Sequence, residues 1–101
     1  MKRTEYIQLL TNEDKVRIEF IQDHGKVLKF VVQYYSLIDS RWRTIMRIDN
    51  CHGFPHRHVY YLRRREFKVV LDKDTNTAFT GAKEYILKNF SKIKQNFLFA
   101  E

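Results

Sequence analysis

Three of the four histidines fall within a short segment that also holds the only proline and the only cysteine of the chain. We call residues 49–58 the histidine segment. Apolar β-formers on both sides of it predict two strands joined by a loop around residues 53–55. Because strand side chains alternate between faces, His56 and His58 should point the same way and Arg57 the opposite way.

This segment suits proton transfer, because the unperturbed pKa of histidine, ~6.5, lies near neutral pH. Cleavage of RNA by attack of its own 2′-hydroxyl needs a base, an acid and cations that stabilise charge on phosphorus. The pattern favours a metal-independent ribonuclease that needs no cofactor. The candidate catalytic residues are Asp49, His52, His56, Arg57 and His58. The candidate phosphate-binding residues are Arg43, Arg47, Arg63, Arg64 and Arg65.

Other uses of the histidine segment stay open. The histidines could hydrogen-bond backbone groups and hold the loop. Alternatively, His56 and His58 could bind a metal ion with His52 as a third ligand, although nearby cationic side chains would repel a dication. A nucleophilic Cys51 activated by His52 is disfavoured, because adjacent residues in an extended segment point to opposite faces. We expect Cys51 to be a small buried residue.

The overall composition predicts one folded domain and a polyanionic partner. The chain has 101 residues, 44% of them hydrophobic, which fits a single core. A net charge of +7 favours nucleic acid or an acidic protein. One cysteine excludes an internal disulfide, and the first residues turn acidic before a long apolar run develops, so no signal peptide is expected. We expect a cytoplasmic protein without membrane association, because no apolar run is long enough to cross a bilayer.

The pattern of apolar residues predicts an α+β domain that spans residues 1–101. Alternation within residues 15–71 predicts an antiparallel meander of four to five strands, and the stretch 27–37, apolar on both faces, should be central. Helical spacing predicts one long helix, about residues 78–98, packed on one face of the sheet. Its apolar stripe consists of Ala82, Ile86, Phe90, Ile93 and Phe97, and its outer side carries Lys83, Lys88, Lys92 and Lys94. Residues 2–10 fit a short helix or an extended arm equally well.

The strand before the histidine segment should have one packed face and one basic face. Its packed face would consist of Trp42, Thr44, Met46 and Ile48. Its other face would present Arg41, Arg43, Arg47 and Asp49, and the apolar Ile45 interrupts it. This alternation predicts an arginine surface next to the histidines.

The run from Arg47 to His58 reads R-x-D-N-x-H-G-x-P-H-x-H and resembles a signature of the TumE toxin family and of related small one-domain families. The matching positions are Asp49, His52, Pro55, His56 and His58, and the likeness extends more weakly over the following strand and the C-terminal helix, about half of the chain in all. The resemblance implies the toxin of a prokaryotic toxin–antitoxin module that acts on RNA and is neutralised by a DNA-binding antitoxin encoded beside it. RNA and that antitoxin are the expected partners, and a homodimer is left open.

A second function stays open beside the toxin. The chain could be a non-enzymatic basic domain that binds nucleic acid or a protein, with histidines that only hold the loop.

Overall fold

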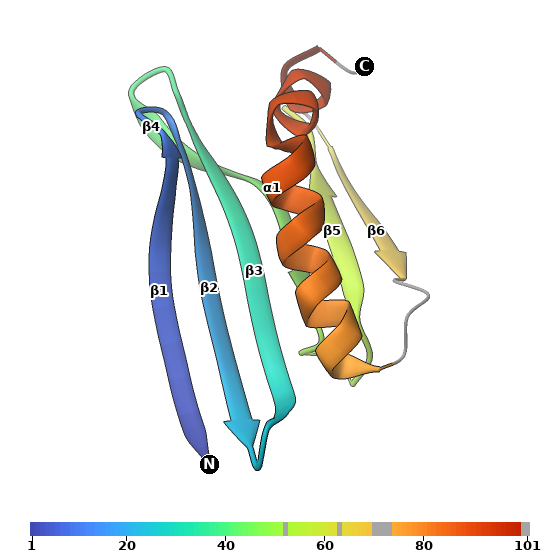
Figure 1. Cartoon of the computed structure of the whole chain (residues 1–101). Coiled ribbons are helices and arrows are strands. Elements are labelled where there is room, and N and C mark those ends of the chain that lie inside the picture. Colours follow the sequence, from blue (N-terminus) through green and yellow to red (C-terminus); the bar gives the residue numbers. More distant parts are fainter. Residues whose placement is uncertain (52, 63, 70–73, 100–101) are drawn as a thin grey trace.

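The described residues form a six-stranded antiparallel sheet and one helix (Figure 1). The structure is a computed structural model that describes residues 1–51, 53–62, 64–69 and 74–99. The elements in chain order are β1 (Lys2–Thr11), β2 (Asp14–Asp23), β3 (Lys26–Ile38), β4 (Arg41–Asp49), β5 (His56–Tyr60), β6 (Arg65–Val69) and α1 (Thr75–Phe99). The spatial order of the strands is their order in the chain, so the predicted α+β meander is confirmed.

The first strand is the element that the sequence left undecided. β1 pairs antiparallel with β2, from Lys2 opposite Gln22 to Thr11 opposite Asp14. Both faces of β1 are largely exposed, so its residues carry no clear alternation of apolar and polar types. Pairing with β2 therefore decides its conformation, and it brings the strands to six rather than the four or five expected.

Two tight turns fix the register of the central hairpins. His24 and Gly25 both have positive φ, 51° and 76°, and so do Asp39 and Ser40, with 52° and 66°. Two central residues with positive φ match the twist of the flanking strands in a two-residue hairpin. β3 is thereby paired on both sides, to β2 and to β4, which confirms its predicted central place.

β4 departs from the predicted alternation at Ile45. Its register against β3 shifts between Thr44 and Met46, which makes Ile45 the extra residue of a β-bulge. A bulge reverses the alternation of faces, so Ile45 is fully buried in the core and Trp42 is 41% exposed. The prediction that Trp42 shares a packed face with Met46 is therefore wrong.

α1 lies across one face of the sheet, with β1 and β2 to one side of it (Figure 1). Phe79 packs against Phe20 and Phe30 of the sheet, with ring centres 4.9 Å and 5.3 Å apart. Phe90 meets the buried Tyr34 edge to face at 6.0 Å. Of the predicted apolar stripe, the structure buries Ala82, Ile86, Ile93 and Phe97 and partly buries Phe90.

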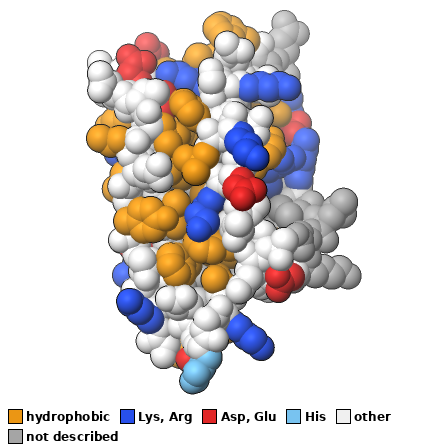
Figure 2. All heavy atoms as spheres, in the orientation of Figure 1, with side chains coloured by type: hydrophobic (Ala, Val, Ile, Leu, Met, Phe, Trp, Pro, Cys, Tyr) orange, Lys and Arg blue, Asp and Glu red, His pale blue; other side chains and the backbone are white. Residues whose placement is uncertain are grey.

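The solvent side of the helix is basic, as the sequence predicted. Lys88 and Lys92 are exposed, and Lys83 and Lys94 are partly buried. Figure 2 shows Lys and Arg side chains along this surface and a hydrophobic area beside it. α1 begins at Thr75, three residues before the predicted start, because the Asp74 carboxylate accepts a hydrogen bond from the Thr77 backbone N–H at 3.0 Å. Over the described residues, no helix is long and apolar enough to cross a membrane.

Candidate functional site

The register of β4 and β5 brings the ends of the histidine segment together. Asp49 pairs with His56, and Arg47 pairs with His58. Directly opposite residues of an antiparallel pair point to the same face, so these four side chains share the face away from α1. Arg57 lies on the other face, where its guanidinium carbon is 5.1 Å from the centre of the Tyr85 ring of the helix. The predicted opposition of Arg57 to the two histidines is confirmed.

The connection between β4 and β5 is held by Asn50. Its Oδ1 accepts a hydrogen bond from the Phe30 backbone N–H at 2.9 Å, and its Nδ2 donates one to the Leu28 carbonyl at 3.0 Å. Gly53, with φ of 95°, donates its N–H to the Asn50 carbonyl at 3.1 Å and turns the chain back toward β5. Asn50 is thus a positioning residue that we did not predict; its place between Asp49 and the glycine turn was the available signal.

The Asp49 carboxylate is the centre of the site. Its Oδ2 accepts a hydrogen bond from Arg47 Nε at 2.8 Å and lies 3.6 Å from His58 Nε2. Its Oδ1 accepts one from the Cys51 backbone N–H at 2.9 Å and lies 3.2 Å from His56 Nε2. We call Asp49, His56 and His58 the Asp–His cluster.

Burial divides the cluster into a hidden part and a reachable part. Asp49 is 1% exposed and His56 is fully buried. The side chain of His58 keeps 17% of its surface exposed, and that of Arg47 keeps 33%. A ligand on this face can therefore touch His58 and Arg47, whereas Asp49 and His56 lie behind them.

The tautomer of His56 follows from its surroundings. Its Nδ1 lies 2.9 Å from the Phe54 carbonyl oxygen, which can only accept, so Nδ1 carries a proton and donates it to this oxygen. The ring also meets Phe54 and His58 edge to face, with ring centres 5.9 Å and 5.0 Å away. Nε2 is therefore the nitrogen that His56 directs to the carboxylate.

The electrostatics of the cluster favour a charged carboxylate. Burial by itself would raise the pKa of Asp49, but the hydrogen bonds from the Cys51 N–H and from Arg47, with the charges of Arg47 and His56, lower it below the ordinary 3.8. Burial by itself would lower the pKa of Arg47, but the hydrogen bond to Asp49 and the charge of that carboxylate outweigh burial, so the pKa of Arg47 is raised.

The pKa of His58 is shifted in the direction opposite to that expected for a histidine in a simple ion pair. Burial lowers the pKa of its imidazole and the Asp49 charge raises it; His56, Arg47 and Arg65 lower it further. The net result is a pKa below 6.5. A neutral ring at pH 7 follows, and a neutral imidazole can accept a proton.

The predicted phosphate-binding arginines do not form one surface. Arg43 lies toward the helix, with its guanidinium carbon 5.4 Å from the centre of the Phe97 ring. Arg64 is exposed and pairs with Glu66. Arg47 and Arg65 are the two that act on His58 electrostatically. Arg63 and the candidate catalytic His52 lie outside the described residues.

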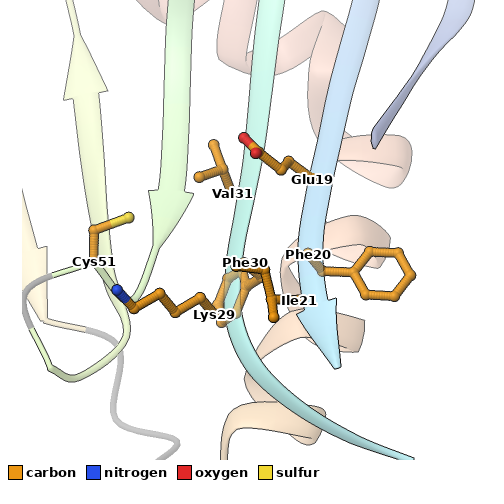
Figure 3. A pocket seen from close by; sticks show the side chains of 7 residues that line it. All are labelled: Glu19, Phe20, Ile21, Lys29, Phe30, Val31 and Cys51. Atoms are coloured by element: carbon orange, nitrogen blue, oxygen red, sulfur yellow. The ribbon is translucent and has the colours of Figure 1, made fainter. Parts of the chain in front are cut away.

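Cys51 is exposed, so the expectation that it is buried is wrong. The Arg47 guanidinium donates a weak hydrogen bond to its sulfur at 3.8 Å. Figure 3 shows Cys51 and Lys29 extending toward one another beside a pocket, with α1 behind the strands. The pocket adjoins the cluster, because its lining residue Val31 pairs with Asp49 across the sheet. The pocket places the cationic Lys29 beside Cys51.

A polar row that we did not single out continues the site across the sheet. Arg17, Gln33, Arg47 and His58 pair in sequence from β2 to β5. Arg17 donates to Gln33 Oε1 at 3.0 Å and to Glu5 and Glu19 at 3.0 Å each. The polar residues that alternate with apolar ones in β2 were the sequence signal for this row. Its alignment with His58, however, depends on three registers: β2 with β3, β3 with β4, and β4 with β5.

Comparison with known proteins assigns the chain to a protein family. No curated protein and no solved structure matches it. One family model does, over residues 1–101, and its description is a domain of unknown function. Since the match covers the whole chain, the protein belongs to the family DUF7718.

Proposed function

We propose that this chain is a small prokaryotic toxin of a toxin–antitoxin module that binds RNA in the cytoplasm and cleaves its phosphodiester backbone. The observation that carries the proposal is His58, a partly exposed imidazole between two arginines and backed by a buried carboxylate. This combination provides a proton acceptor and cations for phosphate on one face. The likeness of residues 47–58 to the TumE signature supports the biological setting.

The chemistry assigns different roles to the cluster residues. His58 is the residue that takes the proton of the attacking 2′-hydroxyl, since its lowered pKa leaves it neutral at pH 7. Arg47 and Arg65 stabilise the charge that develops on the phosphate oxygens. Asp49 and His56 are positioning residues, because their burial keeps them from the substrate. We assign the donation of a proton to the leaving oxygen to His52, one of the candidate catalytic residues from the sequence, which lies outside the described residues.

A matched pair of histidine variants tests the cleavage. His58→Asn removes the proton acceptor, and His24→Asn removes a histidine from the β2–β3 turn, where the side chain is 93% exposed. Asparagine tolerates the positive φ of residue 24. With a purified protein and a synthetic RNA, cleavage by His58→Asn should fall about 10²–10⁴-fold, and His24→Asn should match the wild type. Equal rates for the two variants would refute the assignment.

A non-enzymatic binding domain is the second candidate, and the burial of His56 favours it. In such a domain, His56, which is fully buried and donates to the Phe54 carbonyl, holds the loop. Under this alternative the wild type binds RNA without cleaving it. Replacing Arg47 by alanine should then lower the affinity and reduce the slope of log K against log salt by about 0.7–1, while the exposed Arg41→Ala serves as the charge-matched control.

A further inference from the structure

We propose that Asp49, His56 and His58 form a binding site for one divalent transition-metal ion of the zinc class. Two imidazoles and one carboxylate are a donor set that such ions accept, and three protein ligands leave a position for water or a phosphate oxygen. One ligand atom from each of the three side chains can be chosen so that all lie within 4.8 Å of one another. The site goes beyond the proposed cleavage and rests on geometry alone.

The separations of the donor atoms fit a single ion. Zinc binds nitrogen and carboxylate oxygen at about 2.0–2.2 Å, so neighbouring ligands in a tetrahedron lie about 3.4 Å apart. Asp49 Oδ1 is 3.2 Å from His56 Nε2, and Asp49 Oδ2 is 3.6 Å from His58 Nε2. All three donor atoms lie within 4.8 Å of one another, so side-chain rotations that shorten the longest separation would surround an ion.

The groups around the ligands are also those of a metal site. A metal-binding histidine usually donates its other ring N–H to a carbonyl or carboxylate, which fixes the ring and its tautomer. His56 does so through Nδ1 to the Phe54 carbonyl, which leaves Nε2 directed at Asp49. The carboxylate is held in turn by the Cys51 N–H and by Arg47. Two of the three ligands, His56 and Asp49, are thus oriented before an ion arrives.

Arg47 is the strongest argument against a dication here. Its Nε bonds Oδ2 of Asp49, so its positive charge lies beside the proposed ion. The carboxylate has a second oxygen, Oδ1, that faces His56 and can bind the ion while Oδ2 keeps the arginine. An ion with one carboxylate ligand beside an arginine leaves net positive charge, which favours an anionic oxygen, such as that of a phosphate, at the remaining position.

Metal titration tests the site without any RNA. The protein is stripped with a chelator, dialysed, and titrated with ZnCl₂ in a calorimeter, and its thermal midpoint is measured with and without the ion. The wild type should bind one equivalent, with a raised midpoint. His58→Asn, whose side chain reaches the surface, should fold and lose at least 10-fold in affinity. Cys51→Ser and His24→Asn should bind as the wild type, because neither residue belongs to the set.

The proposal fails if no saturable equivalent binds, or if the loss follows Cys51→Ser or His24→Asn instead of His58→Asn. An RNA assay of the same samples separates this site from the proposed function. A nitrogen that coordinates an ion cannot accept a proton, so bound zinc should inhibit cleavage that uses His58 as the base. If the protein binds zinc but neither the stripped nor the zinc-loaded protein cleaves RNA, the metal site is supported and the proposed cleavage is refuted. If only the zinc-loaded protein cleaves RNA, the metal site is supported and a metal-dependent mechanism replaces the acid–base mechanism.

Discussion

Replacing Asn50 by alanine removes both side-chain hydrogen bonds that tie the histidine segment to β3. The backbone N–H of Phe30 and the carbonyl of Leu28 lose their partner, and the connection that sets Asp49 beside His56 loses its anchor. Asn50 is 8% exposed, so water does not easily replace the lost amide. The variant should therefore be less stable than the wild type, because two buried backbone groups are left without a hydrogen-bond partner.

The size of the loss follows from the two groups left behind. A buried donor or acceptor without a partner costs about 1–3 kcal/mol, so two of them give about 2–6 kcal/mol. For a domain near 100 residues, 1 kcal/mol lowers the thermal midpoint by about 4–8 °C. We expect a midpoint at least about 8 °C lower for Asn50→Ala.

Asn76 provides a matched control within the same chain. It makes the same two kinds of bond, accepting from the Val27 N–H at 2.8 Å and donating to the Gly25 carbonyl at 3.2 Å, but at an exposed site. Water can replace these bonds, and alanine is the better helix former by a few tenths of a kcal/mol. Asn76→Ala should change the unfolding free energy by less than about 1 kcal/mol. Urea unfolding followed by circular dichroism compares the two, and equal losses would refute the burial argument.

Two further predictions concern the helix side of the sheet. Ile86 is fully buried and its neighbour Leu87 is 40% exposed, so Ile86→Ala should cost about 2–5 kcal/mol of unfolding free energy and Leu87→Ala less than about 1 kcal/mol in the same urea assay. Burial raises the pKa of Asp14, but hydrogen bonds from Thr11, Tyr34 and Ser36 and the Lys94 charge together lower it below 3.8. A depressed pKa stabilises the fold above the unfolded value and loses that contribution as pH falls through the folded value. The wild type should therefore lose its advantage over Asp14→Asn as the pH falls below about 4; a difference that stays constant as the pH falls would contradict the role of the charged carboxylate.

The sequence by itself determined the fold class and the helix. The alternation of apolar residues in β2, the apolar residues on both faces of β3 and the stripe through Ile86 and Phe97 are local patterns, because each reflects the geometry of one element. The shared face of His56 and His58 is local in the same sense, since two residues apart on a strand always point the same way. These predictions needed no knowledge of neighbours.

Only the tertiary structure decided the strand count, the bulge and the site. β1 has no periodicity of its own and is a strand because β2 pairs with it. The two consecutive apolar residues Ile45 and Met46 indicated an irregularity in β4. Only the register with β3 shows that this irregularity is a bulge that reverses the faces of the strand. Asp49 becomes the centre of the histidine site because it lies directly opposite His56 on the neighbouring strand. Register is a relation between two strands, so no pattern within one strand can specify it.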